Sequence, residues 1–115
     1  MIIHINTNNT SLVLSAEAGK RPLLLHYGEK LRVQKDYAAL FERYDVPPCG
    51  GSVQASRGET NLFLDEARLY WGTLGRGDFR EPAAEFSLTS GAFTTDFVVE
   101  GAELLDGKPP MTGLP

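Results

Sequence analysis

The apolar residues of this chain come in short runs that turn-forming residues separate. Residues 1–6, 11–15 and 23–27 are rich in Ile, Val and Leu, with Asn, Gly and Pro between them. Short β-branched runs bounded by such residues are typical of strands. The sequence TNNT at residues 7–10 predicts a turn that joins the first two runs as a hairpin. We expect Gly28 to introduce a bulge in the third run.

One segment departs from this pattern. The residues at helical spacing, i, i+3, i+4 and i+7, are Tyr37, Leu40, Phe41 and Tyr44. They would share one face of a helix, and Asp36 is a suitable N-cap. Two prolines and two glycines in residues 47–51 exclude regular structure beyond it. The sequence therefore predicts one short helix, or a loop with helical turns.

The rest of the chain reads as loops and further strands. The polar residues 52–61 predict a loop, whereas residues 83–88 and 92–105 predict strands on either side of a turn. A total of roughly six to eight short strands needs a second layer to bury their inner faces. We therefore predict an all-β, antiparallel β-sandwich with exposed edges that invite pairing with another chain.

Composition excludes several classes of function. A net charge of −4 over 115 residues argues against a general binder of nucleic acid. Cys49 is the only cysteine, which excludes an internal disulfide and suits a reducing compartment. No apolar run predicts a membrane span and no basic-then-apolar start predicts a secretory signal, so we expect a cytoplasmic location. His4 and His26 lack further ligands at metal spacing, and no phosphate-binding loop occurs, so we expect no metal and no cofactor.

The segment LGRGDFREP, residues 74–82, contains the adhesion tripeptide Arg-Gly-Asp. Such a short motif often arises by chance, and a scaffold role explains the residues better. The glycines permit positive φ, and Asp78 can accept local backbone N–H bonds. Arg80 can pair with a carboxylate, and we expect Phe79 to fill the core.

Several blocks together resemble the N-terminal β-sandwich domain of glycoside hydrolase family 36, which consists mainly of α-galactosidases. The matching blocks are Tyr27-Gly28, Gly77-Asp78-Phe79-Arg80 with Pro82-Ala83, Gly107-Lys108-Pro109 and Gly113-Leu114-Pro115. The Asp-Phe-Arg block followed by Gly-Lys-Pro is the most specific part. In the resembled family the sandwich continues past Gly-Leu-Pro, and a (β/α)8 barrel then carries both catalytic aspartates. The resemblance implies that residues 1–115 form a single partial domain without the barrel.

The resemblance also implies a function. The parent protein would remove terminal α-linked galactose from raffinose- or melibiose-type sugars, and this chain alone would have no catalytic residue. A loop of this domain reaches a neighbouring subunit's active site in tetrameric family members. By position, Asp45 matches the aspartate of that loop, and Phe41 or Tyr44 matches its aromatic residue. A homo-oligomer is therefore expected.

Two other interpretations remain open. Phe41 and Tyr44 can instead be the buried face of a short helix, with Asp45 at its solvated end. The chain can also be a stand-alone carbohydrate-binding or interaction module, for which Trp71, Tyr70 or Tyr44 would supply an exposed aromatic platform. For Trp71, the only tryptophan, a core position is favoured.

Overall fold

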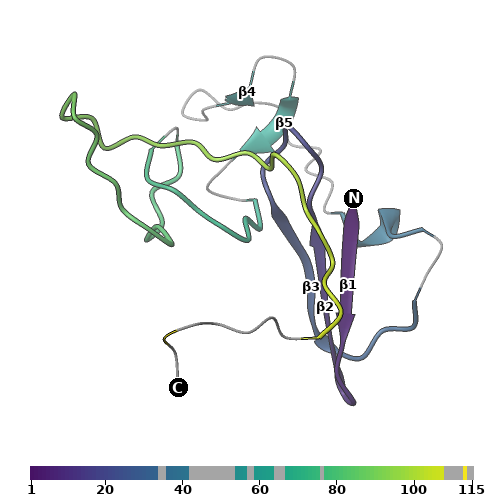
Figure 1. Cartoon of the computed structure of the whole chain (residues 1–115). Helices are drawn as coiled ribbons and strands as arrows, with labels where there is room; N and C mark the ends of the chain where they lie inside the picture. The colour runs from purple at the N-terminus through teal and green to yellow at the C-terminus, as the bar shows by residue number, and fades with distance from the viewer. Residues whose placement is uncertain are drawn as a thin grey trace.

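The computed structural model describes residues 1–33, 36–41, 54–56, 59–63, 67–75, 77–107 and 113. The strands β1 (Ile2–Asn6), β2 (Thr10–Ser15) and β3 (Leu23–Glu29) form an antiparallel sheet in the order β1-β2-β3 (Figure 1). The strands β4 (Gln54–Ser56) and β5 (Glu59–Phe63) form a second antiparallel pair. The only helical element among the described residues is one 3-10 turn, η1 (Ala38–Leu40). The prediction of an all-β, antiparallel fold with at most one short helix is confirmed.

The predicted hairpin of the first two strands is present. Asn6 pairs with Ser11, which leaves residues 7–10 as the turn. The Thr7 backbone N–H donates to the Thr10 carbonyl at 2.9 Å, and the Thr7 hydroxyl oxygen accepts the Thr10 N–H at 3.0 Å. A side-chain oxygen that bonds nearby backbone stabilises a turn without help from distant parts of the chain.

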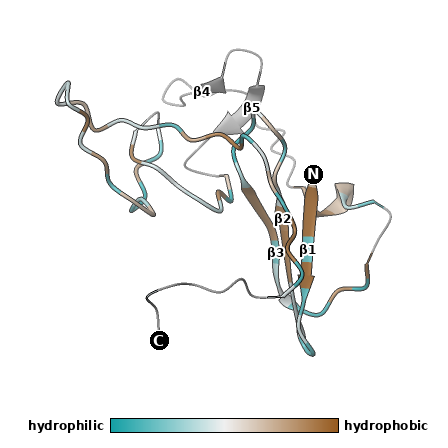
Figure 2. Cartoon of the chain, viewed as in Figure 1, coloured by the Kyte–Doolittle hydropathy of each residue, from teal (hydrophilic) through white to brown (hydrophobic). Residues whose placement is uncertain are grey.

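The buried side of the sheet centres on β2. Ser11, Val13 and Ser15 are buried and alternate with half-buried neighbours, which is the period of two that a strand requires. Leu25 of β3 and Ala67 are the other buried apolar residues that the structure describes. Figure 2 shows the hydrophobic residues concentrated along these strands.

The predicted bulge exists, but it lies elsewhere. Val13 pairs with His26 while Leu14 pairs with Leu24, so Leu25 is the extra residue of β3. Gly28 pairs in regular register with Ser11, and the prediction of a bulge there is wrong. The shift in register allows the buried Leu25 to face the core. The packing of this apolar side chain therefore decides the position of the bulge more than the conformational freedom of Gly28 does.

Two further assignments from sequence are wrong. Residues 52–61 were expected to be a loop, yet β4 and most of β5 lie within this segment as a hairpin. Residues 83–88 and 92–105 were expected to be strands, yet they form no ladder with the described chain. Only Val99 makes a bridge, with Ala18. Alternating side chains favour extended backbone, but a strand also needs a partner for its hydrogen bonds.

Of the predicted helix, the described residues contain only η1, and residues 42–44 lie outside them. The N-cap is Tyr37 and not Asp36 as predicted, although the Asp36 carboxylate accepts the Ala38 N–H at 2.8 Å. The turn stops because Phe41 is extended, with φ −75° and ψ 123°. Tyr37 directs its hydroxyl to His4 of β1, where Oη and Nδ1 are 2.7 Å apart.

The chain near residue 97 returns to the first sheet (Figure 1). The Val99 N–H donates to the Lys20 carbonyl at 2.9 Å, and the Gly19 N–H donates to the Val99 carbonyl at 2.8 Å. Arg21 also binds Asp96 through two hydrogen bonds of 2.9 and 2.8 Å; the Arg21 side chain is largely buried, whereas Asp96 is partly exposed. This bidentate pair fastens two segments that are 75 residues apart.

Gly75 occupies a position where only glycine fits. Its φ is +108°, and an added Cβ would lie 2.5 Å from Thr94 Cγ2. We expect Gly75→Ala to lower the free energy of unfolding by about 2 kcal/mol, because both the backbone and Thr94 must shift. Chemical denaturation followed by circular dichroism measures this effect.

Gly91→Ala is the matched control for this substitution. Gly91 has a similar φ of +80°, but nothing lies within 4 Å of the added Cβ. The control should cost only about 1 kcal/mol, the penalty of the left-handed backbone. Equal losses in the two variants would show that the contact with Thr94 is unimportant.

Candidate functional site

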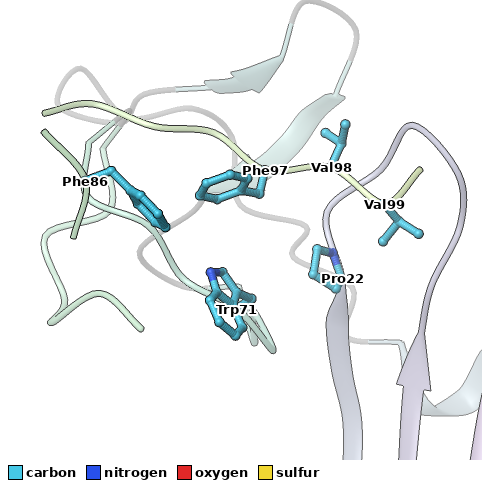
Figure 3. Close-up of a pocket in the computed structure, with 6 residues that line it drawn as sticks. All are labelled: Pro22, Trp71, Phe86, Phe97, Val98 and Val99. Carbon is cyan, nitrogen blue, oxygen red and sulfur yellow. The ribbon is translucent and has the colours of Figure 1, made fainter. Parts of the chain in front are cut away.

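An apolar groove lies between the extended C-terminal segment and the start of β3. The groove has a volume of about 300 Å³ and an almost wholly apolar lining. The lining residues are Pro22, Trp71, Phe86, Phe97, Val98 and Val99 (Figure 3). Phe86 and Phe97 meet edge to face, with ring centroids 5.3 Å apart. A sugar needs hydrogen-bond partners for its hydroxyl groups, so this lining suits an apolar side chain better than a saccharide.

Trp71 is part of this groove rather than of a core. It is 45% exposed, so the core position favoured from the sequence is wrong. The reason is the missing ladder: Phe86 and Phe97 lie near Trp71 (Figure 3), but residues 84–98 form no row of paired strands that would cover its ring. Tyr70 beside it is exposed as well.

Asp78 and Arg80 confirm the scaffold role predicted for the 74–82 loop. The Asp78 carboxylate is buried and binds the Arg80 guanidinium through two bonds of 2.9 Å. It also accepts the Arg80 backbone N–H at 3.1 Å. Arg80 Nη1 donates to the Ala67 carbonyl at 2.8 Å, which ties the loop to the core. These bonds with the guanidinium hold the pKa of Asp78 below its ordinary value of 3.8, against the opposing effect of burial.

Phe79 does not fill the core, contrary to the prediction. Its side chain is 88% exposed. Because successive side chains of an extended segment point to opposite sides, burial of Asp78 directs Phe79 to solvent. The expected positive φ is present at Gly75 and Gly77.

A polar cluster on the first hairpin joins Ser11, His4 and Tyr37. The Ser11 hydroxyl donates to Asn6 Oδ1 and accepts the Leu31 backbone N–H at 2.8 Å. The Ser11 hydroxyl proton is therefore used in the bond to Asn6. His4 Nε2, which lies 3.2 Å from the Ser11 oxygen, must then donate its proton to that oxygen. His4 Nδ1 then accepts the Tyr37 hydroxyl proton. A histidine in this state cannot activate Ser11 as a nucleophile, and the cluster is a structural link between β1, β2 and η1.

Phe41 is the only described member of the three residues proposed to contact substrate. Tyr44 and Asp45 lie outside the described residues, and so does Cys49. Phe41 is 38% exposed and lines a second small cavity, together with Leu40 and the β3 residues Leu23 to Leu25. It therefore lies at the edge of the sheet, neither in the core nor fully in solvent.

The sequence reasoning missed the Arg21–Asp96 pair and the role of Phe86, Phe97 and Pro22 in the groove. No local signal could reveal them, because each contact joins segments far apart in the chain. In the described part of the chain, no three His, Cys, Asp or Glu side chains are grouped as metal ligands. The described residues also include no helix with the length and hydrophobicity of a membrane span.

Comparison with known proteins first defines the class of fold. All of this chain superposes on part of a variant of the family 36 α-galactosidase AgaA from Geobacillus stearothermophilus, solved in complex with raffinose. The TM-score is 0.80 at 24% identity, and the match covers 16% of the AgaA chain. The chain therefore has the fold of a β-structured segment of an α-galactosidase.

The family follows from the sequence comparisons. Residues 20–115 match the model of the glycosyl hydrolase family 36 N-terminal domain, and the chain belongs to this family. It is 36% identical to α-galactosidase 2 of Hypocrea jecorina over 69 residues, 60% of this chain and 9% of that protein. It is 49% identical to α-galactosidase C of Emericella nidulans over 41 residues, 36% of this chain and 6% of that protein. The chain thus spans less than a tenth of the curated relatives that it matches.

Proposed function

We propose that this chain is the non-catalytic N-terminal part of an α-galactosidase that removes terminal α-linked galactose from raffinose- or melibiose-type oligosaccharides. The observation that carries the proposal is the family 36 N-terminal match over residues 20–115, since the relatives in this family are α-galactosidases. In this proposal the enzyme works in the cytoplasm, and the chain contributes contacts between subunits and a loop near the substrate.

The charges of the described residues support a non-catalytic role. Hydrolysis of a glycosidic bond uses two carboxyl groups that flank the bond. Asp78 is bound to Arg80 and Asp96 is bound to Arg21. Glu17 pairs with Lys20 at 3.0 Å on the surface. None of these three carboxylates lines the groove, and in this proposal bond cleavage belongs to another part of the enzyme.

The loop that begins at Phe41 is the part of the chain proposed to meet substrate in a neighbouring subunit. The aromatic face of Phe41 or Tyr44 suits the C–H face of galactose, and the Asp45 carboxylate can accept hydrogen bonds from two adjacent hydroxyl groups. The support from the structure is the partial exposure of Phe41 at the sheet edge.

Asp45→Ala tests this role in an enzyme that carries the chain as its N-terminal segment. We expect KM for raffinose to rise about tenfold with kcat nearly constant, because the lost hydrogen bonds stabilise the bound substrate and the transition state equally. Steady-state kinetics measures both constants, and the melting temperature shows that the fold persists. Unchanged KM and kcat would remove Asp45 from the site.

A stand-alone carbohydrate-binding or interaction module is the alternative function. The observation that favours it is the exposure of Trp71 and Tyr70, which are adjacent in sequence. Exposed aromatic rings can stack on a sugar or on another protein. The apolar lining of the groove favours the protein partner.

A further inference from the structure

The groove between the start of β3 and the C-terminal segment has an open apolar surface. Its lining includes Trp71, which lies across from Phe97 (Figure 3), and both rings are partly exposed. Val98 beside Phe97 is 49% exposed. Apolar surface gathered in one place on a soluble protein commonly marks an interaction site, because its exposure to water is unfavourable. The described residues leave this surface uncovered.

The walls of the groove are held in place by bonds outside its lining. The ion pair between Arg21 and Asp96, with bonds of 2.9 and 2.8 Å, joins the two segments that form the walls. Two backbone hydrogen bonds of Val99 join the same segments. Because these bonds fix the walls before anything binds, the groove is preformed. The six lining residues carry no charged group, so an apolar occupant is favoured over a charged one.

The volume of the groove indicates the size of this occupant. An apolar cavity of about 150 Å³ holds one benzene ring, and the groove has a volume of about 300 Å³. It therefore has room for about two side chains of that size. Residues i and i+2 of a β-strand point to the same side, about 6.6 Å apart. One strand with two apolar side chains, such as leucine or phenylalanine, would fill the groove.

The most direct source of such a strand is the rest of the same polypeptide. The chain has a radius of gyration of 16.5 Å, whereas a compact domain of this length has about 13 Å. It also spans only a small part of the α-galactosidases that it matches. A strand that is covalently joined to the chain has a high effective concentration at the groove, whereas a separate partner must rely on its own affinity. A tethered strand is therefore favoured over a free protein.

We propose that a β-strand from the part of the enzyme outside residues 1–115 covers this groove and inserts two apolar side chains into it. The inference rests on the proposed function, in which the chain is the N-terminal part of a longer enzyme. It adds the place at which that enzyme packs on this segment.

Thiol labelling tests whether the groove is covered. Val98→Cys and Leu88→Cys are compared in a Cys49→Ser background, both in the 115-residue chain and in an enzyme that carries this chain as its N-terminal segment. The two native side chains are 49% and 47% exposed, but only Val98 lines the groove. In the 115-residue chain we expect a maleimide to label both variants at similar rates.

In the longer enzyme, labelling of Val98→Cys should slow by at least about tenfold, because the thiol reacts only when the strand is displaced. Leu88→Cys should keep its rate. Mass spectrometry of the peptide that contains the new cysteine separates it from other thiols of the enzyme. Equal rates for Val98→Cys in the two proteins, or equal slowing of both variants, would overturn the proposal.

Val98→Asp tests the energetics of the same contact. In the 115-residue chain the new carboxylate stays hydrated, so the midpoint of urea unfolding should hardly change. In the longer enzyme the carboxylate would lie beneath the strand without a partner, and the midpoint should fall by about 1 M or more. Hydrogen exchange of the β1, β2 and β3 amides reports on this segment, and Leu88→Asp is the control. The same small shift for Val98→Asp in both proteins would contradict the proposal.

Neither measurement uses a galactoside, so the two proposals fail separately. A longer enzyme that shields residue 98 but does not hydrolyse raffinose would remove the galactosidase assignment and keep the packing site. One that hydrolyses raffinose while residue 98 stays equally reactive would remove the packing site and keep the assignment.

Discussion

Asp78→Ala should lower the free energy of unfolding by about 3 kcal/mol. Asp78 is buried and accepts three hydrogen bonds from Arg80, two from the guanidinium and one from the backbone. Removal of one partner of a buried ion pair commonly costs about 3–5 kcal/mol. The half-exposed Arg80 can regain water, which places the cost at the lower end. Denaturation with urea measures the loss.

The contribution of Asp78 should also depend on pH. Its pKa in the folded chain lies below the ordinary value of 3.8 because Arg80 donates hydrogen bonds to the carboxylate. The folded state therefore favours the deprotonated form. This contribution is fully present above the unfolded pKa and is lost as the pH falls through the folded pKa. Below pH 3.8, the stability of the unmodified chain should approach that of Asp78→Ala.

Asp106→Ala is the control for these measurements. Asp106 is an exposed carboxylate near the C-terminus, and its removal should change stability by less than about 0.5 kcal/mol. A difference between Asp78→Ala and the unmodified chain that stays constant from pH 7 down to pH 2 would show that ionisation of Asp78 does not stabilise the fold.

Ser11→Ala should cost about 2.5 kcal/mol, the second largest effect that we expect. The buried hydroxyl serves Asn6, the Leu31 backbone N–H and His4 at once. Alanine fills most of the space but leaves these groups without a partner. Each unsatisfied buried polar group costs about 1–3 kcal/mol. Urea denaturation measures the loss, with Ser87→Ala as the exposed control.

Hydrogen exchange distinguishes this explanation from a general loss of packing. In Ser11→Ala, the amide of Leu31 should exchange faster than the amides of β1 and β2, because it loses the Ser11 hydroxyl oxygen as its acceptor. Uniform acceleration across the sheet would mean that Ser11 acts through packing and not through the Leu31 bond.

The sequence predicted the local parts of the fold. The β1–β2 hairpin follows from two apolar runs and a threonine turn that bonds itself. The strands expected at 83–88 and 92–105 failed because a ladder depends on a second segment, which local periodicity does not specify. The β4–β5 hairpin was missed because its residues are mostly polar.

The site was less accessible from sequence than the fold. The ion pair of Asp78 could be predicted from the local sequence, because its partner Arg80 is only two residues away. The groove requires Pro22, Trp71 and Phe97 to meet, and nothing in their spacing predicts it. For Tyr44 and Asp45 the substrate role stays a prediction.

The attachment of residues 96–99 to residues 18–21 also determines which contacts can form first while the chain is being synthesised. The hairpin of β1 and β2 uses only the first 15 residues, so the ribosome has produced all of its parts early. Arg21 must wait until Asp96 emerges 75 residues later, and Gly19 must wait for Val99. Contacts between such distant residues form late. A nascent chain that stalls before Val99 would therefore have a formed sheet without the backbone bonds of Val99 to it. Proteases would reach residues 67–95 first.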